Sequence, residues 1–312
     1  MANGPVYQDP ALTQISQMYK NDDDSFIAEK LFPVIPVDTP TGVYWEYGRE
    51  FIKKPISTLR TGRGSTPEAS YSRSKKNFGP LAEHDLKDFI TWEERKTQQN
   101  PLDADTDAVI FLNQQMDIEK EVALATKLSD TAQITLNTTL TGGNQWSDYA
   151  NSNPFTDITT GITTQMKNGL KPPNTIFMGW EVWAQLMNHP DLLDRVKFNQ
   201  LGVLTTELLR GMFADKGITQ ILIGKSVYDT AAEGIAASNG FAWGKNFWLG
   251  YVNQTPSLRQ VNGGYTLVLK DGRFVDRWTD QDEKLDWIRN NDFYEQKLVG
   301  VEAFYLIKNA VA

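Results

Sequence analysis

One long amphipathic helix is the feature that most constrains the fold of this chain. The sequence predicts that it starts at Asn100-Pro101 and runs to about Leu128, because Pro is favoured in a first helical turn and acidic residues follow it. A nearly apolar stripe recurs at alternating steps of four and three residues: Ala104, Ala108, Phe111, Gln115, Ile118, Val122 and Ala125. Val109, Leu112, Met116 and Ala123 widen it. At about 1.5 Å per residue such a helix is roughly 40 Å long, so it can span a whole domain.

Length and composition exclude several classes of protein. A chain of 312 residues with 40% hydrophobic and 22% charged residues forms one large or two modest globular units, not a disordered or collagenous chain. The absence of Cys excludes disulfide scaffolds, thiol nucleophiles and thiolate zinc sites, and is typical of folding in a reducing cytoplasm. The first ten residues lack the features of a signal peptide, and no apolar run approaches the ~18 residues of a membrane helix. We therefore expect a soluble intracellular chain without a membrane partner.

The segment 42–90 is predicted to be a long, extended and basic loop. Between Arg49 and Lys76, eight basic residues against two acidic ones give a net charge of +6, which leaves −14 for the rest because the whole chain carries −8. An extended basic loop without a core of its own is stable only on a partner, and the acidic remainder of a neighbouring copy offers one. A solvated mobile loop is the alternative. The candidates for intersubunit ion pairs are Arg49, Lys53, Lys54, Arg60, Arg63, Arg73, Lys75 and Lys76.

Four aromatic residues stand near the start of that loop. We expect them to pack at the loop base, with an ordinary intrachain core as the alternative. They are Tyr44, Trp45, Tyr47 and Phe51.

The rest of the chain mixes predicted helices and strands, so the expected class is α+β. Helices are predicted at about 10–19, at 157–168 with Thr156 as cap, at about 180–197 with a break at Pro190, and at 205–214. A buried strand is expected at 175–178. The segment YTLVLKDGRFVDRW is predicted to be a hairpin that turns at Asp271-Gly272, and YEQKLVGVEAFYLIKN to be one long final strand.

No motif points to catalysis, a cofactor or a metal. The acidic residues between Asp276 and Glu283 could include a general acid and base, which would make the chain a soluble hydrolase, but acidic clusters are usually solvated. His84 stands between two acidic residues, which favours an ion pair, and His189 at a helix break favours hydrogen bonds to turn backbone. We predict no enzyme activity and no cofactor.

The order of segments and several stretches of sequence resemble the major capsid proteins of tailed double-stranded-DNA bacteriophages, which have the Hong Kong 97 capsid fold. ALTQISQMYKNDDDSFIAEKLFPVIPV is similar to the opening segment in one subgroup of that family, NPLDADTDAVIFLNQQMDIEKEVALAT to the start of its spine helix, PNTIFMGWEVWAQLMNHPDLLDRVKF to the start of its central domain, and NDFYEQKLVGVEAFYLI to its final strand. These stretches are spread along most of the length of the chain, from residue 11 to residue 307.

The resemblance implies an organisation and a function. Residues 1–41 would be an N-terminal arm, 42–90 the extended loop, 91–172 and 276–312 a peripheral domain with the spine helix, and 173–275 an axial domain. The chain would be a capsid subunit of the virion, assembled in the host cytoplasm as hexamers and pentamers into an icosahedral shell that encloses double-stranded DNA. Its partners would be copies of itself, a scaffolding protein, a portal and possibly a decoration protein. A shell of the encapsulin type, a cellular nanocompartment for an enzyme cargo, is the alternative within the same fold.

Some members of that family link neighbouring subunits covalently through a loop Lys, an Asn and a Glu. The resemblance puts Gln296 and Ala303 at the positions of the Asn and the Glu, although Glu302 is one residue away. Covalent linking is therefore not expected here, and Lys53 and Lys54 are assigned to ion pairs instead.

Overall fold

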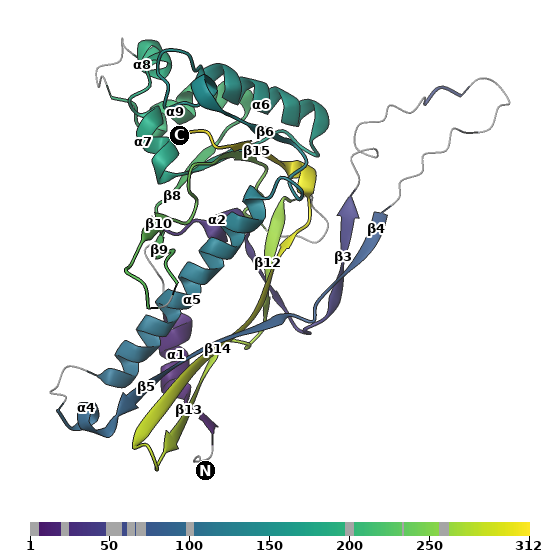
Figure 1. Ribbon diagram of the computed structural model, residues 1–312. Helices are drawn as coiled ribbons and strands as arrows, with labels where there is room; N and C mark the ends of the chain where they lie inside the picture. Colours follow the sequence, from purple (N-terminus) through teal and green to yellow (C-terminus); the bar gives the residue numbers. More distant parts are fainter. Residues whose placement is uncertain are drawn as a thin grey trace.

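The computed structural model describes residues 6–19, 25–47, 58–60, 66, 73–97, 103–196, 203–232, 234–255 and 262–312. The long helix α5 (Ala104–Ser129) runs diagonally through the molecule and joins two β-sheets (Figure 1). One sheet lies near the N-terminus at the bottom of this view and is called the lower sheet. The other lies near the C-terminus at the top and is called the upper sheet. None of the helices in the described part of the chain combines the length and the apolar character that a membrane span needs.

Helix α5 is the predicted long helix, but its start and its buried face differ from the prediction. It begins at Ala104, and the side chain of Asp103 caps it by accepting a hydrogen bond from the backbone N–H of Asp105. Phe111, which was assigned to the apolar stripe, is 51% exposed. Five predicted residues are buried: Ala108, Val109, Leu112, Met116 and Ala125. The buried face also includes residues outside the predicted stripe: Asn113, Lys120, Glu121, Leu124 and Leu128. The prediction followed apolar residues alone, whereas this face also buries polar side chains that have partners in the lower sheet.

The lower sheet is built around β14 (Leu285–Leu298). Strand β5 (Ala82–Thr91) pairs antiparallel with β14 along one edge. Strands β12 (Gly264–Leu269) and β13 (Phe274–Asp280) both pair antiparallel with β14 as well. The sheet is completed by β2 (Val34–Val37), parallel to β12, and by β1 (Tyr7–Gln8), antiparallel to β13. Segments from both ends of the sequence therefore meet in one sheet.

The predicted hairpin at Asp271-Gly272 is wrong in its pairing. Asp271 does adopt a turn conformation with a φ of 58°, and the backbone N–H of Gly272 donates to Leu269. However, β12 and β13 pair with β14 and not with each other. Tyr294 pairs with Val268 and with Ala82, and Asn291 pairs with Phe274 and with Asp85, so β12 and β13 lie end to end on the side of β14 opposite β5. The turn is a bulge between two strands in line.

The upper sheet has the strand order β6 (Asn137–Thr139), β15 (Phe304–Lys308), β11 (Phe247–Gly250), β7 (Thr175–Gly179) and β8 (Gln220–Gly224). Helices α6 (Pro154–Asn168), α7 (Trp180–Leu186), α8 (Pro190–Val196) and α9 (Thr206–Phe213) gather at this end of the molecule (Figure 1). They share the largest hydrophobic core with the sheet, which includes Ile158, Ile176, Val182, Leu209 and Phe247. The break before α8 at Pro190 and the buried strand β7 agree with the prediction from the sequence. Helix α6 starts earlier than predicted, at Pro154, and is capped by Asn153 and not by Thr156.

The predicted final strand is two strands in two different sheets. Strand β14 ends at Leu298, a short 3₁₀ turn covers Val301–Ala303, and β15 begins at Phe304. At Gly300 a Cβ atom would lie 2.7 Å from the backbone oxygen of Asn262, so the chain passes too close to its neighbour there for any side chain. This close crossing ends the first strand and lets the chain change sheets.

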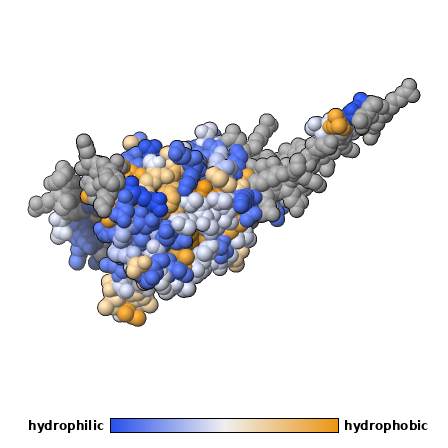
Figure 2. Space-filling model, turned by 90° about the horizontal axis from the view of Figure 1, so that it is seen from above, coloured by the Kyte–Doolittle hydropathy of each residue, from blue (hydrophilic) through white to orange (hydrophobic). Residues whose placement is uncertain are grey.

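Short elements complete the fold. Helices α1 (Pro10–Met18) and α2 (Ala28–Leu31) contact α5, and α4 (Trp92–Thr97) follows β5. Strands β9 (Val227–Asp229) and β10 (Asn239–Phe241) form a hairpin. Strands β3 (Gly42–Tyr47) and β4 (Arg73–Phe78) form a two-stranded ribbon that projects from the body (Figure 1). Seen from above, the coloured surface of the body is mostly hydrophilic with hydrophobic residues interspersed (Figure 2).

Candidate intersubunit surfaces

The β3–β4 ribbon carries those predicted basic residues that the structure describes. Lys75 and Lys76 are both exposed on β4 and, as consecutive strand residues, they point to opposite faces of the ribbon. Arg60 is exposed in the segment between the two strands, and Arg73 contributes its backbone to β4. The other four lie outside the described residues: Arg49, Lys53, Lys54 and Arg63. The intersubunit role of all eight stays a prediction.

The root of the ribbon is anchored by an apolar cluster. Tyr44, from the predicted aromatic set, packs against a core of Phe78, Leu81, Tyr265 and Leu267. Trp45 and Tyr47 contribute their backbone to β3, and Phe51 lies outside the described residues. Beside this cluster opens a groove of about 440 Å³, lined mainly by apolar residues of β2, β3 and β12. Intrachain packing thus holds the ribbon at its root, while Lys75, Lys76 and Asn77 further along β4 are exposed.

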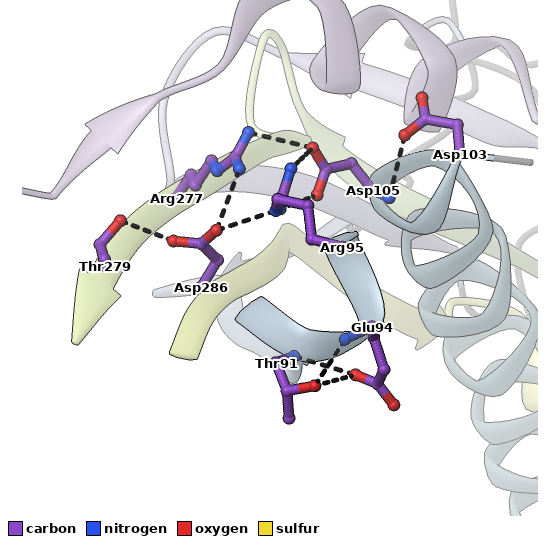
Figure 3. Close-up of polar contacts among 8 residues, drawn as sticks. All are labelled: Thr91, Glu94, Arg95, Asp103, Asp105, Arg277, Thr279 and Asp286. Carbon is purple, nitrogen blue, oxygen red and sulfur yellow. Dashed lines mark hydrogen bonds and ion pairs between the residues drawn. The ribbon is translucent and has the colours of Figure 1, made fainter. Parts of the chain in front are cut away.

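Two arginines and two carboxylates hold the N-terminal end of α5 against its neighbours (Figure 3). Arg95 of α4 donates to both oxygens of Asp105, at 2.6 and 3.1 Å, and its Nε lies 3.1 Å from Asp286 of β14. Arg277 of β13 lies 3.1 Å from Asp105 and 3.6 Å from Asp286. The two carboxylates are mostly buried, so these pairs lose little to solvent screening. Asp105, expected only to favour the helix dipole, joins α4, α5, β13 and β14.

A buried polar seam joins the middle of the spine helix to the lower sheet. The side-chain oxygen of Asn113 accepts hydrogen bonds from Ser16, from Arg273 at 2.6 Å and from Asn290. About two helical turns further along α5, Lys120 Nζ lies 3.1 Å from Asp292 Oδ2, and 10% and 3% of the two side chains are exposed. Sequence reasoning missed this seam. Its only local signal is the step of four that puts Lys120 in line with the buried apolar residues of α5.

Glu121 holds the N-terminal segment against the spine helix. Its carboxylate, 1% exposed, accepts hydrogen bonds from the backbone N–H of Ile27 at 2.8 Å, from that of Ala28 at 2.9 Å and from Trp243 Nε1 at 2.7 Å. Burial raises the pKa of Glu121, while the three donated hydrogen bonds act in the opposite direction. One side chain thus joins α2, α5 and the segment that leads into β11.

The acidic residues considered for catalysis have structural partners. Asp276 lies 2.6 Å from Arg289 and accepts a hydrogen bond from Asn291. Asp280 accepts hydrogen bonds from the backbone N–H groups of Asp282 and Glu283 in an exposed turn. Neither residue is poised to exchange a proton with a substrate in a cleft.

His189 also makes contacts that differ from those of a catalytic base. Its Nδ1 accepts a hydrogen bond from the backbone N–H of Asp191, as expected for a His at a helix break. That contact leaves the proton on Nε2, which lies 2.9 Å from Ser152 Oγ, while this hydroxyl donates to the backbone oxygen of Asp148. Because the ring donates to the serine and cannot accept its proton, the pair is not arranged as a nucleophile and base. Burial lowers the pKa of His189, which agrees with a neutral ring.

The comparisons with known proteins point to phage capsids. The chain is 27% identical over 311 residues to the major capsid protein of Burkholderia phage BcepMu, across 96% of this chain and 95% of that protein. A crystal structure of a phage-related protein from Bordetella bronchiseptica RB50 is 23% identical and superposes with a TM-score of 0.75 over 99% of both chains. A chain of the bacteriophage PhiM1 mature capsid superposes with a TM-score of 0.58 at 11% identity, over 93% of this chain and 90% of that one. No protein-family model matches the chain.

The chain has the Hong Kong 97 capsid fold. The predicted α+β class and the resemblance to tailed-phage major capsid proteins are confirmed. Helix α5 lies in the stretch predicted to be the spine helix, and the β3–β4 ribbon lies within 42–90, the predicted extended loop. The predicted domain boundaries do not follow the sheets, because β12 pairs with β14 and β15 pairs with β11. Those boundaries stay a prediction.

Proposed function

We propose that this chain is the major capsid protein of a tailed phage. It assembles as hexamers and pentamers into an icosahedral shell around double-stranded DNA. The observation that carries the proposal is the similarity to a phage major capsid protein along 96% of the chain, together with the capsid fold. A structural role agrees with the ion pair of Asp276 and with the backbone hydrogen bonds that Asp280 accepts.

The mechanism we propose is geometric. A shell repeats one set of contacts between copies, and the projecting ribbon and the arm adapt those contacts to hexamer and pentamer surroundings. Many weak contacts in each subunit add up to a stable shell, while each contact stays reversible enough to correct errors. A net charge of −8 limits the trapping of incoming DNA on the protein. The N-terminal arm is residues 1–41 and the extended loop is 42–90. The peripheral domain combines 91–172 with 276–312, and the axial domain is 173–275.

The proposal includes further partners and a location. Assembly takes place in the host cytoplasm with a separate scaffolding protein, and the finished virion shell also binds a portal and, where present, a decoration protein. Particles purified from infected or induced cells should contain double-stranded DNA. Particles that instead hold a protein cargo and no DNA would favour the nanocompartment function.

Charge reversal in the extended loop tests the electrostatic part of the proposal. Lys53→Glu, Lys54→Glu and Arg60→Glu together should strongly reduce particle formation, because they replace three cations that we assign to ion pairs with neighbours. Helix content measured by circular dichroism should stay unchanged. Reversal of three other exposed cations, Lys96, Lys270 and Lys284, is the control with the same change in net charge. Normal particles from the loop variant would remove the electrostatic role.

A further inference from the structure

Strand β5 has an unpaired outer edge. Its backbone pairs with β14 from Ala82 to Thr91, and no other strand in the described part of the chain pairs with it. The N–H of Trp92 donates to Lys284, which fixes the alternation: residues of even number bond to β14, and those of odd number point their N–H and C=O groups outward. An exposed edge of this kind is a template for an added strand.

Part of this edge is closed and part is open. The outward N–H of Phe89 donates to Asp88 at 2.8 Å, and that of Thr91 donates to Glu94 at 2.9 Å. The outward N–H groups of Glu83, Asp85 and Lys87 have no hydrogen-bond acceptor within the described residues. The open stretch therefore starts at the end of β5 that is nearer to the ribbon in sequence.

The open stretch is acidic on one face of the sheet. Glu83 and Asp85 share this face, whereas the other face of the stretch carries Leu86 and His84, which stacks on Tyr294. The nearest cation to Asp85 is Arg289, at 3.9 Å, and Arg289 is already paired with Asp276 at 2.6 Å. Lys87 lies over the ring of Trp287, 4.2 Å from its centroid. These acids thus have room for cations from outside the chain.

The ribbon has the complementary character. A two-stranded ribbon is marginal in water and gains stability from a third strand. Strand β4 presents the exposed Lys75, which is opposite in charge to Glu83 and Asp85 of the β5 edge. Within the described residues, β4 pairs with β3 alone, so its outer edge can accept a partner.

We propose that strand β4 of one copy adds to the open edge of β5 in a second copy. Main-chain hydrogen bonds join the two edges, and Lys75 pairs with Glu83 and Asp85 on one face of β5. The contact joins different surfaces of the two copies, so repetition produces rings. The inference rests on the proposed function, since it requires that copies of this chain assemble.

Disulfide trapping tests the contact. Because the chain has no natural Cys, only the introduced cysteines can form disulfides. Neighbouring strands lie about 4.8 Å apart, within the Cα separations that a disulfide allows. Lys75→Cys is combined in turn with Glu83→Cys, Asp85→Cys or Lys87→Cys, and assembled particles are oxidised. We expect at least one pair to give intermolecular ladders on a non-reducing gel. The control combines Lys75→Cys with Asp282→Cys, an equally exposed acidic position in the turn before β14, and should give none.

The outcomes separate this inference from the proposed function. Particles that form normally but yield no ladder from any β5 pair would overturn the inference and leave the capsid function standing. A chain that forms no particles under any condition would contradict the proposed function, and the inference with it.

A charge swap gives an independent readout. Lys75→Glu with Lys76→Glu, or Glu83→Lys with Asp85→Lys, should lower the assembled fraction at least tenfold, and the four changes together should restore it to within twofold of the original. The matched control joins Glu83→Lys and Asp85→Lys to Lys96→Glu and Lys270→Glu, which restores the net charge but not the pairing. Equal rescue by both combinations would show that net charge alone matters and would overturn the contact.

Discussion

Replacement of Lys120 by methionine is expected to lower the free energy of unfolding by about 3–5 kcal/mol, the usual cost of breaking a buried ion pair. Lys120 lies 3.1 Å from Asp292, whose side chain is 3% exposed. The other carboxylate oxygen of Asp292 is buried and has no hydrogen-bond partner among the described residues. Without the ammonium group, this carboxylate would be a buried charge with no compensation, in the seam that joins the spine helix to the lower sheet.

A second variant distinguishes the charge effect from lost packing. Lys120→Met combined with Asp292→Asn removes both charges and should recover most of the lost stability. Thermal unfolding followed by circular dichroism measures both effects, under conditions where light scattering shows the same assembly state for all variants. A single variant as stable as the original chain would show that the pair does not hold the helix on the sheet.

Replacement of Trp248 by alanine is the second change with a large expected effect, about 3–5 kcal/mol of lost stability. Trp248 is fully buried in the core between the spine helix and the upper sheet. Its ring stacks on Phe177 with centroids 5.2 Å apart, and Nε1 donates to the backbone oxygen of Leu128 at 2.9 Å. Alanine would leave a cavity and remove the bond that fixes the last turn of α5.

Trp248→Phe is the matched control. Phenylalanine keeps an aromatic ring against Phe177 and loses the hydrogen bond, so we expect a smaller loss of about 1–2 kcal/mol. The unfolding midpoint in urea compares the three chains. An alanine variant that unfolds at the same urea concentration as the phenylalanine variant would contradict the assigned packing role.

Local signals in the sequence are enough for much of the fold. Pro and acidic residues mark the start of α5 to within a few residues, and Pro190 marks the break before α8. The buried strand β7 follows from a short apolar run after two prolines. These features depend on neighbours in sequence, so one sequence is sufficient to predict them.

Long-range pairing explains the main errors. The turn at Asp271 is present, but the adjacent strands both pair with β14, and local turn chemistry does not reveal a shared partner. The predicted final strand changes sheets because of a close contact between Gly300 and Asn262. Lys120 and Glu121 are buried because their partners come from segments far away along the chain.

The intersubunit residues show a different limit. Composition alone identifies the basic segment, but the acidic partner proposed for it belongs to another copy. Only the register of β5 on β14 reveals which backbone groups of that strand point outward. The basic strand was therefore recognisable from the sequence, while its proposed acceptor required the structure.

Electron microscopy of the purified chain, with light scattering over a range of protein concentrations at low and moderate salt, tests the central claim most directly. The capsid function predicts closed shells, or rings of six and five subunits, and their fraction should rise with protein concentration. A monodisperse monomer at every concentration and salt, with a protease-resistant 42–90 segment, would contradict it. A segment that is stable without neighbours would have no need of the contacts proposed here.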